Sequence, residues 1–256
     1  MYSRVGGETP TPTVTALATE TPPMELADGV YALELTMERD DGTATFHPAA
    51  VETPKGPVLI DAGLPGQTDQ LADALATHGL DLADVRAVLL THHDGDHAGG
   101  LAAALERAAD PVVYAHEAAA PYVDGREFPI KSDPEGERYE PVPVDVALQD
   151  GVTFRTDAGP MRAVFTPGHA PGHLAFHFPE SGVVLAADAL RGEGGDLVGP
   201  AEHFTPDMAE ATRSVGRLAE LGADVGTIHC YHGGDVDAGI PEIEAIYESL
   251  AAEHLE

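Results

Sequence analysis

The stretch Thr-His-His-Asp-Gly-Asp-His-Ala-Gly-Gly, residues 91–100, decides how this chain is interpreted. Its metal-competent side chains fall within six positions, directly after the apolar run 87–90: His92, Asp94, Asp96 and His97. Imidazole nitrogen together with carboxylate oxygen suits zinc, iron or manganese. Glycines at positions 95, 99 and 100 let the backbone turn tightly and approach an ion. These residues predict a metal site at the end of a short buried strand.

A polar turn that caps a helix is the simpler interpretation of the same stretch. Aspartate side chains often accept hydrogen bonds from the free N–H groups at a helix start. A helix is expected over residues 99–107, so such a cap would explain one or two of the acids. It would not explain the two histidines beside them. We therefore favour the metal site, which needs further ligands from other loops.

The charge of the chain limits its partners. Lys and Arg number 13 against 44 Asp and Glu, which gives a formal net charge of −31, and Lys55 and Lys131 are the lysines. A surface this acidic argues against nucleic acid and against an anionic membrane as partners. The acids are spread along the chain, and strong salt screens their mutual repulsion. We expect a halophilic source, which describes the solvent and not the function.

Length and composition set further expectations. The 256 residues can form one large domain, and the single cysteine, Cys230, excludes an internal disulfide and a four-cysteine zinc site. No apolar segment approaches the roughly 20 residues that span a bilayer, and the N-terminus lacks the order of a signal peptide. We expect a flexible Thr/Pro-rich leader at 1–24, one domain at 25–256 and a cytoplasmic location. A small-molecule substrate is expected, and a homo-oligomer is compatible with the sequence.

Apolar runs alternate with turn signals in two similar halves. The pattern predicts strands at 29–35, 44–52, 58–60, 85–90, 111–115, 161–166, 174–178, 183–187 and 225–229. It predicts helices at 68–77, 99–108, 206–221 and 241–254. Loops are expected at 124–140 and 191–200. Strands followed by helices in both halves indicate a layered α/β fold.

Three later strand ends each offer one more ligand. His169 closes the sequence Thr-Pro-Gly-His, Asp188 follows an apolar strand, and His232 precedes two glycines. Ligands gathered from the ends of separate strands are the usual way to build a site on a rigid scaffold. Each residue alone is more simply a hydrogen-bonded surface side chain. The order of all the clusters together favours one shared site.

The order of these motifs resembles the metallo-β-lactamase superfamily of metallo-hydrolases, from about Gly29 to the C-terminus. Residues 59–63, Leu-Ile-Asp-Ala-Gly, are similar to that family's first motif, and residues 91–100 to its His-x-His-x-Asp-His signature. His169, Asp188 and His232 match its later motifs. The resemblance implies an α/β fold, a four-layered αβ/βα sandwich with the metal site at the edge between two mixed sheets.

The resemblance also implies a ligand set. Asp96, His97 and His232 would hold one metal, while His92, His169 and the residue at 94 would hold another, with Asp188 bridging. Asp61 would be buried behind the ligands and would orient their loop. The weaker candidates have open roles. His116 either lines the cleft or caps a helix at 117–120, His173 lies behind the ligands, and Tyr231 either donates to substrate or packs in the core.

Asp94 departs from the family pattern, which has histidine at this position. A carboxylate shifts the metal preference from zinc toward iron or manganese. The flavodiiron branch of the superfamily has glutamate here and binds two irons. Alternatively, Asp94 is too short or misaimed, and only the other site binds tightly. We expect Zn2+, as one or two ions, with Fe or Mn possible at the site that contains Asp94.

The predicted function is a metal-dependent hydrolase. A metal-bound hydroxide, held by Asp96 as the catalytic residue, would attack a small ester, thioester or lactone. The alternatives are an iron-dependent redox enzyme with persulfide or dioxygen chemistry, then a nuclease, then a non-catalytic metal-binding domain. Loops at 124–140 and 190–205 would set specificity. Their basic side chains either meet an anionic substrate or are simple surface charges: Arg126, Lys131 and Arg191.

Overall fold

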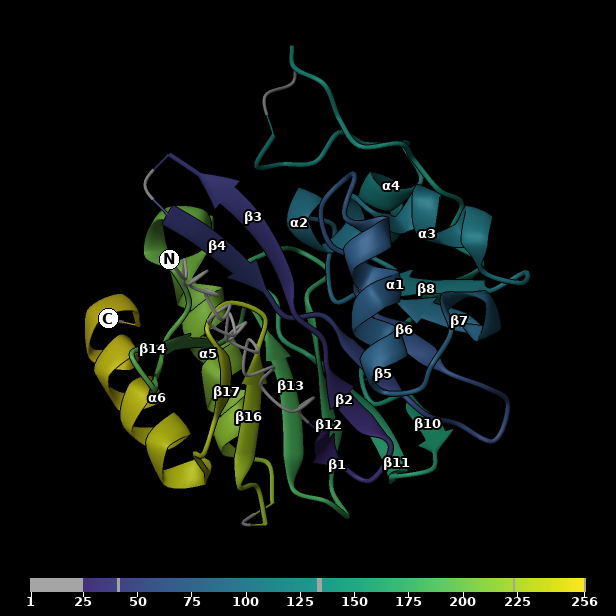
Figure 1. Cartoon of the computed structure of the whole chain (residues 1–256). Helices are drawn as coiled ribbons and strands as arrows, with labels where there is room; N and C mark the ends of the chain where they lie inside the picture. Colours follow the sequence, from purple (N-terminus) through teal and green to yellow (C-terminus); the bar gives the residue numbers. More distant parts are fainter. Residues whose placement is uncertain (1–24, 41, 133–134, 223, 256) are drawn as a thin grey trace, which may run out of the picture.

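Two mixed β-sheets pack face to face, and helices cover their outer faces (Figure 1). The computed structural model describes residues 25–40, 42–132, 135–222 and 224–255. The four-layered sandwich that the resemblance implied is therefore confirmed. The leader predicted at 1–24 lies outside the described residues.

The first sheet has seven strands. In spatial order they are β1 (Glu25–Ala27), β2 (Val30–Ala32), β5 (Ala49–Val51), β6 (Val58–Ile60), β7 (Ala87–Leu89), β8 (Val112–His116) and β9 (Val146–Leu148). The strands from β6 to β9 run parallel to one another, and the others pair antiparallel. The carboxyl ends of β6 and β7 therefore lie next to each other at one edge of the sheet.

The second sheet has six strands. They are β10 (Thr153–Thr156), β11 (Gly159–Phe165), β12 (Leu174–Phe178), β13 (Val183–Ala187), β16 (Thr227–Cys230) and β17 (Gly234–Val236). Only β13 and β16 are a parallel pair. Two hairpins complete the β-structure: β3 (Leu35–Arg39) with β4 (Gly42–Phe46), and β14 (Arg191–Glu193) with β15 (Asp196–Val198).

The helices fall into two groups. The helices of the first half are α1 (Thr68–Thr77), α2 (Gly95–Ala98), α3 (Leu101–Arg107) and α4 (Ala120–Val123), with a 3-10 turn at Leu82–Asp84. Those of the second half are α5 (Met208–Ala219) and α6 (Ile240–His254), with a 3-10 turn at Glu202–Phe204. None of the helices in the described part of the chain combines the length and the apolar run that a bilayer crossing requires.

Alternation along the strands builds the layer between the sheets. In β12, Leu174, Phe176 and Phe178 are fully buried and pack against Ile60 and Leu89 of the first sheet. Ala175, between them, faces the opposite side and joins the core under α5. Successive side chains of a strand point to opposite faces. A strand that is covered on both faces therefore appears in the sequence as a run of apolar residues. For this reason β12 and β13 were predicted with the bounds that the structure shows.

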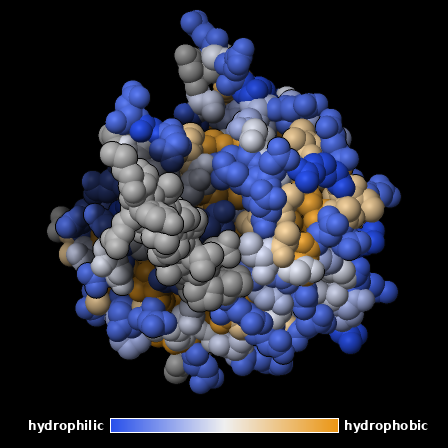
Figure 2. Space-filling model, viewed as in Figure 1, coloured by the Kyte–Doolittle hydropathy of each residue, from blue (hydrophilic) through white to orange (hydrophobic). Residues whose placement is uncertain are grey.

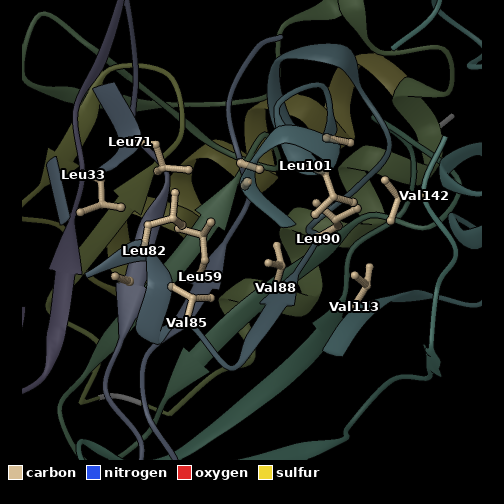
Figure 3. Packing of buried hydrophobic residues seen from close by; sticks show 14 of the residues in the cluster. Leu33, Leu59, Leu71, Leu82, Val85, Val88, Leu90, Leu101, Val113 and Val142 are labelled. Atoms are coloured by element: carbon tan, nitrogen blue, oxygen red, sulfur yellow. The ribbon is translucent and has the colours of Figure 1, made fainter. Parts of the chain in front are cut away.

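The outer layers close over the remaining faces. Leu71 of α1 and Leu101 of α3 pack on Leu59 and Val88 of the first sheet (Figure 3). On the other side, residues of α5 and α6 pack on β13 and β16: Val215, Leu218 and Ile243 with Val184 and Ile228. Each sheet is thus held between its partner sheet and its own helices. Figure 2 shows that hydrophilic residues cover most of one face of the molecule, in keeping with the acidic composition.

The predicted elements differ from the structure mainly in the first and last strands. The strand pair predicted at 29–35 and 44–52 is divided, because β2 pairs with β5 while β3 and β4 form their own hairpin. The loop predicted at 191–200 contains the hairpin of β14 and β15. Strands β1, β9, β10 and β17 were not predicted at all. These strands are three or four residues long, so long-range pairing and not local periodicity defines them.

We predict that Phe176→Ala lowers the free energy of unfolding by about 3–5 kcal/mol, the usual cost of emptying a buried phenylalanine site. Phe176 is fully buried between the sheets, whereas Phe204 is 58 % exposed. Phe204→Ala, the matched control, should change stability by less than about 0.5 kcal/mol. Denaturant unfolding followed by circular dichroism, at one salt concentration, measures both. Equal losses in the two variants would contradict the packing described here.

Candidate metal centre

The predicted ligands meet at the edge where the parallel strands of both sheets end. Asp61 follows β6, and the 91–97 stretch follows β7. In the second sheet, His169 follows β11, Asp188 follows β13, and His232 follows β16. Parallel strands deliver their carboxyl ends to the same side of a sheet. Side chains far apart in sequence therefore converge on one point between the two sheets.

One group consists of Asp96, His97 and His232, whose potential ligand atoms lie within 4.8 Å of one another. The Nε2 atom of His232 lies 3.2 Å from Oδ2 of Asp96. Asp188 joins them, with Oδ2 3.5 Å from Nε2 of His232 and Oδ1 3.5 Å from Nε2 of His97. Among the described residues, His97 Nε2 and Asp188 Oδ1 are buried without a hydrogen-bond partner. Buried polar atoms normally have a partner, and a divalent ion bound here would supply one to both of these atoms.

A second group consists of His92, Asp94 and His169. The Nε2 atoms of His92 and His169 lie 3.3 Å and 3.2 Å from Oδ2 of Asp94. Asp188 also faces this group, because its Oδ2 lies 3.0 Å from Nε2 of His169. Its position between both groups is the one that the resemblance implied. The fit to an ion is less simple here, because Nζ of Lys131 lies 2.5 Å from Asp94 and 2.6 Å from His169 Nε2.

The helix-capping alternative does not describe Asp94. Asp94 stands at the N-cap position of α2, but its side chain makes no capping hydrogen bond. Its carboxylate turns instead toward the histidines and Lys131, with 13 % of the side chain exposed. Asp96 likewise faces His232. The acids of the stretch therefore serve the cluster and not the start of the helix.

Asp61 fixes the ligand loop from behind. It is buried, and Oδ1 accepts a 2.8 Å hydrogen bond from the backbone N–H of Thr91. Its Oδ2 accepts from the Thr91 hydroxyl at 2.7 Å and lies 2.8 Å from Nδ1 of His97. A carboxylate at Nδ1 orients the ring so that Nε2 points at the metal site. Asp61 has φ +64, a left-handed conformation that costs energy for a residue other than glycine.

Two of the glycines in the motif are needed for close packing of the backbone. A Cβ atom on Gly100 would lie 2.2 Å from the carbonyl oxygen of Ala62, and one on Gly99 would lie 2.5 Å from Pro65. A Cβ on Gly95 would meet nothing within 4 Å. Gly99 and Gly100 let the chain after the ligands press against the loop that follows β6.

Opposite charges dominate the electrostatics of the cluster. Burial raises the pKa of Asp188, but contacts with His97 and His169 outweigh burial and hold that pKa well below its usual value. Burial lowers the pKa of His232, yet hydrogen bonds with Asp188 and Asp96 raise it to about 9. In the metal-free protein the Asp188 carboxylate is therefore ionised, while His232 carries a proton at neutral pH. A divalent ion must displace that proton, so binding at these ligands strengthens as the pH rises.

The remaining candidates lie behind or beside the ligands. His173 is fully buried; its Nε2 accepts from the N–H of Asp188 at 3.1 Å, and its Nδ1 lies 2.8 Å from the Thr166 hydroxyl. Tyr231 is buried, its ring stacks on His97 with centroids 3.6 Å apart, and its hydroxyl donates to the carbonyl of Asp96. Both side chains hold ligands in position.

His116 and His93 take no part in the ligand groups of the described residues. Nδ1 of His116 accepts from the N–H of Ala118 at 3.1 Å, and the ring stacks on Phe165. The helix expected at 117–120 begins later, at Ala120, so His116 closes a turn and does not cap that helix. His93 points away from its neighbours in the motif and stacks on Tyr122.

The structure adds side chains that the sequence did not single out as part of the site. Thr91 links Asp61 to the loop, and the Thr205 hydroxyl lies 3.3 Å from Nδ1 of His169. Lys131, treated as one of several basic residues near the cleft, lies among the ligands. Arg126 pairs with the adjacent Asp124, and Arg191 donates to the carbonyl of Gly199, so neither has a contact with the cluster. Of these, Thr91 had a sequence signal as the first residue of the 91–100 stretch, and Lys131 had only its place in the predicted loop.

Comparison with known proteins agrees with this architecture. A sequence model described as "Metallo-beta-lactamase superfamily" matches residues 49–230, more than half of the chain. The chain is 34 % identical over 187 residues to the lactamase-like protein vrtG of Penicillium aethiopicum, which covers 72 % of this chain and 50 % of that protein. It is 31 % identical over 155 residues to the probable metallo-hydrolase YybB of Bacillus subtilis, covering 59 % and 65 %.

A further relative is the thioesterase pkgB of Emericella nidulans, 29 % identical over 211 residues, with 81 % of this chain and 50 % of that protein covered. The chain thus spans about half to two thirds of the length of these three relatives. Among solved structures, a metallo-beta-lactamase family protein of Thermus thermophilus superposes with a TM-score of 0.69 at 27 % identity, covering 90 % of this chain and 81 % of that one.

We predict that Asp61→Asn weakens zinc binding about 10- to 100-fold, the usual effect of changing a residue that orients a ligand. An amide N–H facing Nδ1 of His97 disfavours the tautomer whose Nε2 is free for a metal. Competition with a chromogenic chelator measures the affinity, and circular dichroism verifies the fold. Asp69→Asn is the control, because Asp69 is 97 % exposed in a surface pair with Arg107. Unchanged affinity in Asp61→Asn would contradict the assigned role.

We predict that Cys230 does not react with Ellman's reagent in the native protein. The side chain is fully buried in the core beneath α5, and burial raises the pKa of its thiol. After unfolding in guanidinium chloride, the single cysteine should react in full. The absorbance at equal protein concentration in the two conditions gives the comparison. Rapid reaction of the native thiol would show that β16 is open to solvent.

Proposed function

This chain belongs to the metallo-β-lactamase superfamily, and on that basis we propose that it is a metal-dependent hydrolase of small esters, thioesters or lactones. The observation that carries the proposal is the group of Asp96, His97, His232 and Asp188, in which His97 and Asp188 are buried and each has one ligand atom without a hydrogen-bond partner. Zn2+ is the proposed metal for these ligands, since nitrogen and carboxylate oxygen suit it. When bound, such an ion supplies Lewis acidity and an activated water near neutral pH.

The exposure of the ligands indicates from which side a substrate approaches. The side chains of His97 and Asp188 are 0 % and 8 % exposed, whereas those of Asp96 and His232 are 26 % and 34 % exposed. The inner pair would hold the metal in place, and the outer pair borders the open side. Asp96 is therefore the carboxylate placed to take a proton from the attacking water and return it to the leaving group.

Two exposed apolar residues are next in sequence to residues that contact the centre, and we propose that they help to bind an acyl substrate. Phe204 is 58 % exposed and precedes Thr205, whose hydroxyl contacts His169. Ile130 is 44 % exposed and precedes Lys131. Exposed apolar residues at the edge of a polar site are typical of substrate contacts. A relative named as a thioesterase supports an acyl substrate, and one named as a probable metallo-hydrolase supports hydrolysis.

The redox alternative draws on one observation, the carboxylate of Asp94 in the group with His92 and His169. Iron and manganese accept such a ligand readily. Lys131 opposes this reading, because its ammonium lies where an ion in that group would bind. A nuclease is opposed by the formal net charge of −31, which repels a polyanion. We therefore place hydrolysis of a small molecule first.

We predict that His97→Ala and His232→Ala each abolish stoichiometric zinc binding. Hydrolysis should fall by more than about 100-fold, the upper range for residues that merely support a ligand. Metal content after gel filtration, and initial rates on a panel of p-nitrophenyl esters, acyl thioesters and lactones, measure the two effects. Both measurements use the wild-type protein as reference.

His78→Gln provides the matched control. His78 hydrogen-bonds to the carbonyl of Ala32 and its ring packs at a tilt against Tyr31, outside every ligand group of the described residues. It should keep wild-type zinc content and rates. Full hydrolysis by metal-depleted His97→Ala would exclude the proposed function, as would stoichiometric iron with visible absorption in protein purified without oxygen.

A further inference from the structure

Lys131 lies inside one of the two ligand groups and not on the surface. Its Nζ atom is 2.5 Å from Oδ2 of Asp94 and 2.6 Å from Nε2 of His169. Its side chain is only 18 % exposed. Both partner atoms belong to the group of His92, Asp94 and His169 that could hold an ion. The ammonium thus lies against two of these three ligands, Asp94 and His169, while Nε2 of His92 has no hydrogen-bond partner.

The segment that carries Lys131 is held by hydrogen bonds within itself, to α4 and to the motif. It belongs to the connection between α4 and β9, which rises above α2 and α4 at the top of Figure 1. The guanidinium of Arg138 donates to the carbonyls of Tyr122 and Glu127 at 2.6 Å and 3.0 Å. The hydroxyl of Tyr139 donates to the carbonyl of His93 within the motif at 2.8 Å. These bonds hold the connection over the ligands.

An ion and this ammonium cannot share the group. Zinc lies about 2.0–2.2 Å from nitrogen and carboxylate ligands. The Lys131 nitrogen is only a few tenths of an ångström farther from Asp94 and His169 than a bound ion would be. Two cations in one such space would overlap and repel each other. Either Lys131 leaves when metal is present, or the group holds no second ion.

The balance of charge favours the second outcome. Three carboxylates face the two groups: Asp94, Asp96 and Asp188. One divalent ion together with one ammonium offsets their three negative charges. Two divalent ions would exceed the charge of the carboxylates alone and would also release the lysine from its pair with Asp94. Buried charges are stable only when paired.

We propose that Lys131 permanently takes the place of the second metal ion, so that this protein holds a single divalent ion, bound by Asp96, His97 and His232. Asp94 then is the partner of an ammonium and not a replacement ligand. A carboxylate pairs with an ammonium more strongly than the imidazole that the family pattern has at this position. The inference rests on the proposed function and adds the number of metal ions that each chain binds.

The test is the amount of zinc retained after the holoprotein is loaded with excess zinc and passed through gel filtration, measured by elemental analysis and native mass spectrometry. Wild type should hold one ion per chain. Lys131→Met, which keeps the length of the side chain and removes its charge, should hold two. Lys55→Met is the matched control, because Lys55 is the other lysine, is exposed and should leave one ion.

Two ions in wild type, or one ion in a folded Lys131→Met, would overturn the proposal. If neither protein binds an ion, both this proposal and the proposed function are overturned. A measurement on wild type alone covers the case in which the variant does not fold. In the zinc-loaded protein an acylating reagent should modify Lys131 at least about tenfold more slowly than Lys55, since reaction requires local opening. Equal rates would show that zinc expels Lys131 and would overturn the proposal.

Discussion

The hydrogen bonds of Asp61 are the constraint on which the rest of the centre depends. This single carboxylate fixes the Thr91 backbone, the Thr91 hydroxyl and the ring of His97. Its left-handed backbone, and that of Ala187 at the end of β13, place strain at the two strand ends that border the site. Buried bonds of this number can hold such a conformation, since strain persists where the surroundings over-determine it. This strain lowers the stability of the fold and keeps the ligand side chains in a fixed orientation.

The two sheets contribute different residues to the site. The first sheet contributes a contiguous stretch after β7, while the second contributes single residues after β11, β13 and β16. The cluster therefore exists only while the layer of Phe176, Leu89 and their neighbours holds the sheets together. Asp188 is the clearest example, because it contacts His97 from the first sheet and both His169 and His232 from its own.

Much of this could be predicted from the sequence, for reasons that differ between elements. Strands β6, β12 and β13 are covered on both faces, so continuous apolar runs located them. The ligands were recognisable because their spacing matches a family pattern. The hairpin of β14 and β15 was missed, because its Gly-Glu-Gly-Gly-Asp sequence has no strand periodicity and only pairing makes it extended. The packing role of Gly100 was not predicted, because what it contacts is decided by the loop after β6.

Lys131 shows where sequence reasoning stops. Nothing in residues 124–140 has a periodic pattern, and the position of the lysine depends on contacts of Arg138 and Tyr139 with residues up to 46 positions away. Asp94, seen alone, had three explanations: a ligand for iron, a misaimed ligand, or a cap. In the fold it has a fourth, because a lysine from another segment lies against it. The aspartate at position 94, in place of histidine, and the lysine at position 131 complement each other. Either residue without the other would be a buried charge without its partner. Asp94, the residue that departs from the family pattern, is thus explained as the acidic partner of Lys131 in an ion pair.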